Sequence, residues 1–529
     1  MSASREKQNR QAAGQAGPKT AREAQQRKEQ QKSNLLYGFI AAAVVVVLIA
    51  SVIWRSDLIP KMTTAATIDG EKYSTAEVSY YYQSAYRNFV TNSQYSYFLS
   101  YLGLNTSASL KTQPISADAA SMLGIELPEA AEGEEVPTMT WHDYFLDQAL
   151  KNISMVQNGL KAAEAEGFQY PAGVQAQYED NMESLRSVAA ASGSSVSQYL
   201  KATFGTGVTE KLYGEQLMRM LRFDAYANAY RNSLTYSDSE LEEAYNANPN
   251  PYDRVSYETV SVSGAAESTT DDDGNTLEPT EEESAAALEA AKLAAQLILD
   301  GFQNGGDLEA LAEEHNGTYS ENENGSYYSG SVMSEWLFDS TRKAGDTAVL
   351  EDGTIQYVMV FHDRFRDESP TVDVRHILVR LGTATLSEED EGYADEQAQL
   401  KADAHAKAEE LLAQWQSGEA TEDSFGTLAI AESADGSKYS GGLITDIYQG
   451  QMVPEFNDWC FDAGRQPGDN GVVDSQYGSH VMYFVDSKLQ LWASQVASTL
   501  REEAYTEWEE NFAATDTIQR NESGLKMIG

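Results

Sequence analysis

Two histidines, His376 and His480, stand in segments that read as β-strands and could supply imidazoles to one site. Residues 372–380 and 477–485 both alternate residue types with a period of two and are rich in β-forming residues. Two such imidazoles beside an apolar groove would hold a hydrogen-bond network, and ordinary core histidines are the alternative. No third ligand stands at metal spacing, so we predict no metal and no cofactor.

The chain between the two histidines contains the other parts that such a site needs. A helical segment, a loop with Asp435, the pair Gly441-Gly442 and the segment 450–456 follow one another. The last segment reads Gly-Gln-Met-Val-Pro-Glu-Phe and supplies large apolar side chains. We therefore expect a groove with an apolar wall next to the histidines.

These pieces, in this order, resemble a parvulin-type peptidyl-prolyl cis/trans isomerase domain over residues 372–486. The matching motifs are Arg375-His-Ile-Leu378, 425–429, Ser433-Ala-Asp435, Gly441-Gly442, 450–456, Gly468 and Tyr477-Gly-Ser-His480. The wider layout is similar to the extracytoplasmic foldases of Gram-positive bacteria. In those proteins a parvulin domain joins a helical chaperone domain that is built from both N- and C-terminal segments.

The resemblance implies a set of site residues. It implies catalytic roles for His376, Asp435 and His480, with Asp435 at the family's Cys-or-Asp position. The substrate-binding residues that it implies are Ile444, Ile447, Met452, Phe456 and Ser475, and the first four form an apolar proline pocket. The loop 441–447 departs from the family's Gly-Gly-Asp-Leu-Gly pattern. An aliphatic wall therefore replaces an aromatic one, unless Tyr448 substitutes.

Such a site fits the physics of proline isomerisation. Rotation about an Xaa-Pro bond has a barrier of about 18–20 kcal/mol, because amide resonance is lost in the twisted state. No covalent bond is made or broken, so a catalyst needs only to favour the twisted amide over both planar forms. An apolar pocket can hold the proline ring, while Asp435 sets the polarity near the carbonyl. We assign no nucleophile.

The composition narrows the class of partner. The chain has 529 residues and a net charge of −45, which argues against nucleic acid because phosphates need clustered Lys and Arg. Such a charge is typical of a soluble body that self-repulsion keeps dispersed. The only cysteine, Cys460, cannot form an intrachain disulfide, and we read it as a small buried hydrophobe.

The N-terminus differs from the rest of the chain. Residues 1–34 form a basic tail, and residues 35–54 run without a charge for long enough to span a bilayer as a helix. Basic residues before the run favour a cytoplasmic N-terminus and an extracytoplasmic bulk. We predict a single-pass anchor in the cell membrane, and a cleaved signal peptide is the alternative.

The remaining pattern predicts an α+β protein. The capping-box pattern at 74–77 starts a tyrosine-rich helix, in which we read Tyr80, Tyr81 and Tyr82 as core. After 487 an amphipathic helix should pack back onto the helical domain. The predicted units are a helical chaperone-like domain (67–247, completed by 487–520), a degenerate parvulin-like domain (251–366) and a parvulin-type domain (371–486).

The two β-rich units read as copies of one another. Trp336-Leu-Phe-Asp339 matches Trp459-Cys-Phe-Asp462, and Tyr357-Val-Met-Val-Phe361 matches His480-Val-Met-Tyr-Phe484. Aligning 255–260 with 374–379 puts Tyr257 at the position of His376 and Tyr357 at that of His480. The first copy therefore keeps the scaffold and loses the groove chemistry.

These patterns and the resemblance together predict a membrane-anchored foldase. It would bind unfolded or partly folded secreted polypeptides and speed their Xaa-Pro isomerisation, which is otherwise slow enough to limit folding. The alternative is a non-catalytic chaperone or assembly scaffold with a vestigial parvulin fold. We expect no nucleic-acid partner.

Overall fold

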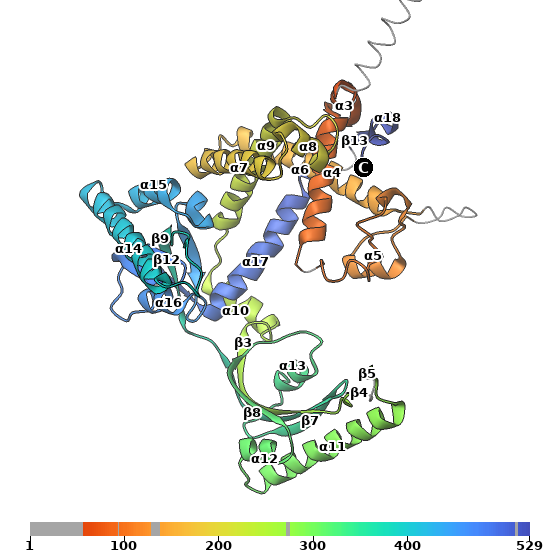
Figure 1. Ribbon diagram of the computed structural model, residues 1–529, viewed down its shortest axis with the longest axis vertical. Helices are drawn as coiled ribbons and strands as arrows, with labels where there is room; N and C mark the ends of the chain where they lie inside the picture. Colours follow the sequence, from red (N-terminus) through yellow and green to blue (C-terminus); the bar gives the residue numbers. More distant parts are fainter. Residues whose placement is uncertain (1–56, 94, 129–137, 271–275, 514–516) are drawn as a thin grey trace, which may run out of the picture. The chain divides into compact units, whose positions relative to one another are not determined.

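The computed structural model describes residues 57–529 apart from residues 94, 129–137, 271–275 and 514–516. The predicted basic tail (1–34) and transmembrane helix (35–54) lie outside the described residues. No helix within the described part is both long and apolar enough to cross a membrane. The described chain divides into two compact units. Figure 1 shows the ribbon of the chain, coloured along the sequence from the N-terminus to the C-terminus.

The first unit is mainly helical. It contains the described residues up to Phe168, together with Tyr178–Asp224 and Glu509–Gly529. Its elements are α3 (Leu58–Met62), β1 (Thr64–Ile68), β2 (Glu71–Ser74), α4 (Thr75–Thr91), η1 (Leu110–Thr112), α5 (Ala117–Leu123), α6 (Trp141–Ala165), α8 (Val196–Phe204), β13 (Ile518–Arg520), α18 (Glu522–Leu525) and parts of α7 (Ala172–Ala191) and α9 (Glu210–Ser233).

Aromatic side chains form much of the core of this unit. The predicted capping box is present, since Ser74 and Glu77 cap each other at the start of α4. The prediction that Tyr80, Tyr81 and Tyr82 belong to the core is confirmed, because all three are buried. Strand β13 pairs antiparallel with β1, so a C-terminal segment completes the small sheet of this unit.

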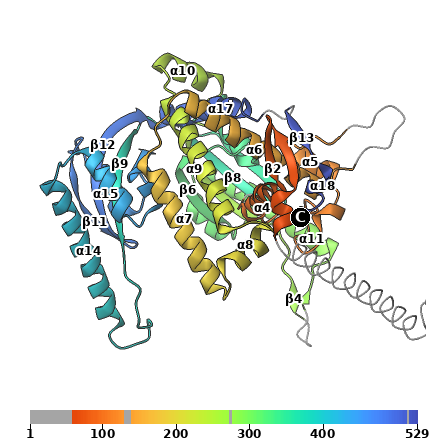
Figure 2. The same ribbon diagram turned by 90° about the horizontal axis from the view of Figure 1, so that it is seen from above.

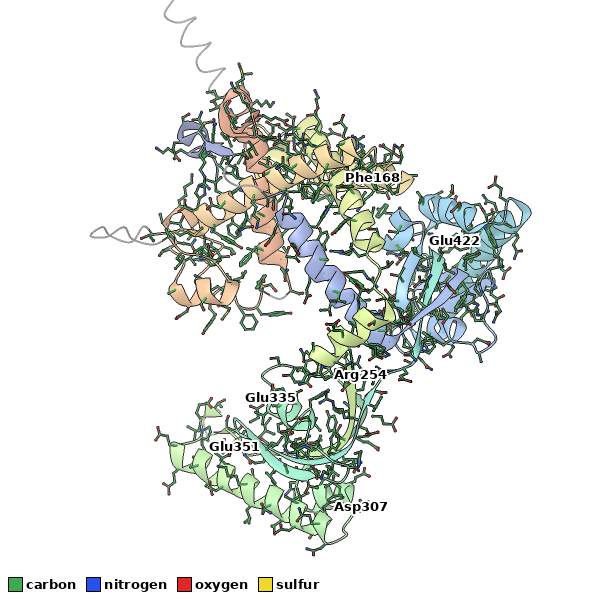
Figure 3. All side chains as sticks on the ribbon, turned by 180° about the vertical axis from the view of Figure 1, so that it is seen from behind. Phe168, Arg254, Asp307, Glu335, Glu351 and Glu422 are labelled. Atoms are coloured by element: carbon green, nitrogen blue, oxygen red, sulfur yellow. The ribbon has the colours of Figure 1, made fainter. Side chains whose placement is uncertain are left out.

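The second unit contains two four-stranded antiparallel sheets of the same strand order. It comprises Gln169–Gln177 and Ala225–Trp508. The first sheet and its helices are β3 (Asp253–Ser263), α11 (Glu281–Gln303), α12 (Leu308–Glu314), β6 (Thr318–Gly325), α13 (Val332–Leu337), β7 (Thr347–Asp352) and β8 (Ile355–Arg366), with the small pair β4 (Thr269–Thr270) and β5 (Thr276–Leu277) beside them. Its strand order is β6-β3-β8-β7. Arg254 on β3 and Glu351 on β7 are labelled in Figure 3.

The second sheet repeats this plan with the order β10-β9-β12-β11. Its elements are β9 (Pro370–Arg380), α14 (Tyr393–Ser417), α15 (Glu422–Glu432), η2 (Gly436–Ser440), β10 (Leu443–Ile447), α16 (Pro454–Cys460), β11 (Asn470–Ser475) and β12 (Gly478–Gln490). Helix α14 lies along the sheet in Figures 1 and 2, and Ile377 and Val481 pack on it and on α15. Phe456 and Cys460 of α16 pack on the opposite face.

The contacts around α13 and α16 show that the two sheets are copies. Arg342 donates to the carbonyl oxygen of Trp336 and lies 4.0 Å from its ring. Arg465 makes the same two contacts with Trp459, again at 4.0 Å. The backbone of Phe361 exchanges hydrogen bonds with residues 345 and 346 as the backbone of Phe484 does with residues 468 and 469.

Strand pairing corrects one detail of the predicted repeat. In the second copy, His376 lies opposite Met482 and Leu378 opposite His480. In the first copy, Thr259 lies opposite Met359 and Ser261 opposite Tyr357. The prediction that Tyr257 occupies the position of His376 was therefore wrong by two residues. Thr259 stands there, and Tyr357 keeps the position of His480.

The C-terminal helix α17 (Leu491–Glu510) buries its apolar stripe, as its pattern predicts. Trp492, Val496 and Ala497 pack with Leu241 of α10 (Asp238–Ala247). The Trp508 ring stacks on Tyr230 of α9 with centroids 4.5 Å apart. These contacts join α17 to α9 and α10, which the sequence analysis places at the end of the helical domain. The predicted domain boundaries remain predictions.

Candidate active site

The two strand histidines meet on one face of the second sheet. Strands β9 and β12 are antiparallel neighbours, and their register puts the side chains of His376 and His480 on the face that α16 covers. The two Nδ1 atoms are 3.2 Å apart. The residues are 3% and 5% exposed, so the pair is almost fully removed from water.

The outer nitrogens of the pair have polar partners as well. Nε2 of His480 lies 2.8 Å from Oγ of Ser475, at the end of β11. Nε2 of His376 lies 3.1 Å from Oγ of Ser437 and 3.2 Å from Oδ1 of Asp435. The result is one continuous network from Ser475 through both imidazoles to the carboxylate of Asp435.

These partners restrict where the protons are. Only one hydrogen fits between two Nδ1 atoms 3.2 Å apart, so both rings cannot be imidazolium at once. A carboxylate only accepts, so Nε2 of His376 donates to Asp435. In the neutral pair, His480 then donates its Nδ1 hydrogen to His376, and the hydroxyl of Ser475 donates to His480.

Electrostatics favour this arrangement. Burial, followed by the positive charge that His376 can carry, lowers the pKa of His480 from 6.5 to about 4. The hydrogen bond from His376 holds the pKa of Asp435 below its ordinary value, although partial burial opposes it. At neutral pH the site therefore contains an ionised carboxylate at one end and an uncharged imidazole at the other.

Phe456 forms the apolar wall beside the imidazoles. It lies on α16, and its ring meets the rings of His376 and His480 edge to face, with centroids 5.5 and 5.4 Å away. Met452 and Ile444 are half-buried and pack on the same core. Their partial exposure leaves both able to contact a substrate.

Ile447 does not belong to that wall. It is 0% exposed and packs with Val372 and Val374 in the core. The pairing of β10 with β9 is irregular between Ile444 and Ile447, which turns Ile447 inward. In this structure Ile447 supports the sheet, and its role in substrate binding stays a prediction.

Sequence reasoning missed Ser437, which touches His376 from the same loop as Asp435. The backbone N–H of Ser437 donates to Oδ1 of Asp435 at 2.8 Å, in the manner of an Asx turn. The spacing Asp-Gly-Ser is a signal of such a turn and could have placed this hydroxyl beside the carboxylate.

A pocket opens on the Ser475 side of the network. Its volume is about 370 Å³. The residues that line it are Leu381, Lys401, Glu455, Asp474, Ser475, Gln476, Gly478 and Ser479. Because Ser475 is part of this wall and also contacts His480, a peptide held over the pair has space for a flanking side chain here.

The fold and this network together define a parvulin-type domain. Residues 358–488 match the PPIC-type PPIase domain family, and they include both histidines, Asp435 and Ser475. This part of the chain is therefore a parvulin-type peptidyl-prolyl isomerase domain. No curated protein matches the chain.

Several solved structures are similar to this chain. The PrsA peptidylprolyl isomerase of Bacillus anthracis is 22% identical over 30% of this chain and 60% of its own, with a TM-score of 0.17. PrsA of Bacillus subtilis is 12% identical over 71% of this chain and 88% of its own, with a TM-score of 0.27. A SurA-like chaperone structure from Campylobacter jejuni is 13% identical over 85% of this chain and 93% of its own, with a TM-score of 0.12.

Proposed function

We propose that this protein is a membrane-anchored extracytoplasmic foldase that catalyses Xaa-Pro isomerisation in secreted or cell-envelope polypeptides. The observation that carries the proposal is the His376–His480 pair, with Nδ1 atoms 3.2 Å apart next to the ring of Phe456. A proline ring held against Met452 and Ile444, the half-buried residues that pack on the same core as Phe456, brings its amide close to this network. The dry surroundings disfavour the polar planar amide more than the twisted one.

A peptide assay tests the catalytic part. The cis-to-trans relaxation of an Xaa-Pro peptide is measured with the full-length protein and with His376→Ala and His480→Ala. Loss of a preorganised polar group costs about 10²-fold in rate, so both variants should be strongly impaired. His405→Ala is the matched control, because His405 is a half-buried histidine of α14 that contacts Asp474 and not the pair. Equal rates for all four proteins would remove the catalytic claim.

The uncharged run at 35–54 supports the membrane part of the proposal. Twenty apolar residues in a helix span about 30 Å. In cells, the full chain should sediment with membranes and resist extraction at high pH, and added protease should reach it from outside. Recovery in the soluble fraction of the cell interior would contradict this topology.

A second candidate is a chaperone that holds clients without turning their proline bonds. The first unit favours it, because Tyr97, Phe98 and Tyr101 are 86%, 55% and 72% exposed. They belong to a stretch, 88–117, in which Lys111 is the only charged residue, so the stretch itself offers a client no acidic side chain. Replacing the three rings by Ser should abolish suppression of client aggregation, whereas His376→Ala should not.

The first sheet, in the predicted domain 251–366, then serves as a degenerate parvulin-like binding or spacing module. It has Thr259 and Tyr357 at the two histidine positions. Neither residue carries an imidazole, so the first copy lacks the histidine pair and should not catalyse isomerisation. Deleting the activity of the second copy alone should therefore remove all isomerisation.

A further inference from the structure

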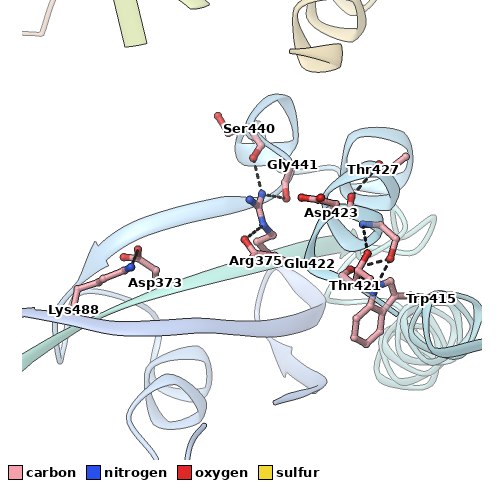
Figure 4. A network of polar contacts seen from close by, with 11 residues as sticks. Asp373, Arg375, Trp415, Thr421, Glu422, Asp423, Thr427, Ser440, Gly441 and Lys488 are labelled. Carbon is pink, nitrogen blue, oxygen red and sulfur yellow. Dashed lines mark hydrogen bonds and ion pairs between the residues drawn. The ribbon is translucent and has the colours of Figure 1, made fainter. Parts of the chain in front are cut away.

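Arg375 connects three separate elements next to the histidine pair. It precedes His376 on β9, so its side chain lies on the opposite face of the sheet. Its Nε donates to Oε1 of Glu422 at 2.9 Å, and its Nη1 donates to the carbonyl oxygens of Ser440 and Gly441, each at 3.0 Å (Figure 4). One guanidinium, 16% exposed, thus joins a strand, the start of α15 and a turn.

The turn approaches β9 closely. The backbone N–H of His376 donates to the carbonyl oxygen of Gly442 at 2.9 Å. A Cβ on Gly442 would lie 2.3 Å from the carbonyl oxygen of His376, and one on Gly441 would lie 2.8 Å from Nη1 of Arg375. Both glycines also have positive φ, +68° at Gly441 and +73° at Gly442. The turn can therefore occupy this place only with glycine, and the guanidinium fills the adjacent space.

The same turn is connected to the residues that face the pair. The N–H of Gly442 donates to the carbonyl oxygen of Ser437 at 2.9 Å. Ser437 in turn donates its own N–H to Asp435, and both side chains contact Nε2 of His376. A displacement of the turn is therefore transmitted to both polar partners of His376.

We propose that Arg375 is a positioning residue of the isomerase site, which acts by setting Asp435 and Ser437 at hydrogen-bond distance from His376. The proposal rests on the proposed isomerase function. Three donors in a fixed fork are needed to hold one carboxylate and two carbonyls at once, which a lysine ammonium on a flexible stem does less well. A misplacement of about 1 Å can cost about 10²-fold in rate.

Kinetics of single and double variants separate positioning from general support of the fold. Arg375→Gln should lower kcat/KM about tenfold to hundredfold, mainly in kcat, and Arg375→Lys should recover part of it. If Arg375 acts through Asp435, the loss from Arg375→Gln should shrink to less than about threefold in an Asp435→Ala background. Losses that simply multiply in the double variant would overturn the proposal.

The matched control is Arg465→Gln. Arg465 belongs to the same domain, is 18% exposed and also donates to a main-chain carbonyl, that of Trp459. It has no connection to Asp435 in the described contacts, so kcat/KM should stay at the wild-type value. An equal fall in both arginine variants would assign Arg375 a structural role only.

Imidazole ¹⁵N spectra give a readout that does not depend on turnover. In Arg375→Gln and Arg375→Lys, the Nε2 resonance of His376 should shift as its partners move, while the resonances of His405 stay in place. Unchanged His376 signals in both variants would overturn the proposal even if the wild type proves inactive. If Arg375→Gln fails to fold, Arg375→Lys, which keeps the stem and the charge, decides by the same comparison.

Discussion

Mild acid should weaken the strands of the active site through His480. Its pKa is about 4 in the folded protein, against 6.5 for an ordinary histidine, because burial, followed by the positive charge that His376 can carry, disfavours the imidazolium. The unfolded chain therefore takes up the proton first as pH falls from 6.5 to 4. Stability from neutral His480 is fully present above pH 6.5, falls through this window and changes no further below pH 4.

The size of the effect follows from the gap between the two pKa values. At about 1.36 kcal/mol per pH unit, it amounts to about 3 kcal/mol between pH 7 and pH 4. Asp435 affects stability only at lower pH, because its folded pKa is depressed and its stabilising contribution is lost only below about pH 4. For His405 the sign is opposite: a hydrogen bond with Asp474 raises its pKa, so its protonation as pH falls stabilises the folded protein.

Hydrogen exchange resolved by mass spectrometry can measure this in the full-length protein. After correction for intrinsic exchange, the opening free energy of peptides from β12 should fall by about 3 kcal/mol from pH 7 to pH 4. In His480→Gln, which cannot titrate, the fall should be below about 1 kcal/mol. A flat profile in the wild type, or an equal slope in the variant, would refute the reasoning.

Three further predictions concern buried positions next to the second sheet, in the turn before β10 and on α16. Gly442→Ala should destabilise β9 by about 2–4 kcal/mol in the same exchange measurement, because its Cβ would meet the carbonyl oxygen of His376 at positive φ. Phe456→Ala should cost about 3–5 kcal/mol and most of the isomerase rate, whereas Phe338→Ala in the first sheet should spare the rate. Cys460 is buried, and burial raises its thiol pKa to about 12, so iodoacetamide at pH 8 should modify it only after unfolding.

The centre of the site was predictable because it depends on strand alternation. Residues two apart share a face, so the runs around His376 and His480 already place their side chains together once the strands pair. Ile447 was not predictable in this way. The irregular pairing of β10 and the left-handed Asp446, at φ 57°, break the alternation between Ile444 and Ile447. No period-two pattern shows where such an interruption falls.

The two-residue error in the repeat has a related cause. A strand that slips by two residues keeps every side chain on its original face, so hydrophobic pattern cannot distinguish Tyr257 from Thr259 as the counterpart of His376. Strand pairing decides between them. Phe361 and Phe484 make the same backbone hydrogen bonds to the preceding turn, which fixes the register of β8 and through it that of β3.

With the register fixed, the first sheet serves as an internal control for the second. It keeps the strand order and the arginine–tryptophan contact, yet Thr259 turns its hydroxyl to the sulfur of Met359 at 3.3 Å. This fold therefore forms without buried imidazoles. In the second sheet, burial disfavours the charged form of His480, and Asp435 remains ionised beside His376 with 37% of its side chain exposed. The fold does not need these imidazoles, yet the second sheet holds them, with the pKa of His480 perturbed, beside an accessible carboxylate. The best explanation is that they act on a substrate.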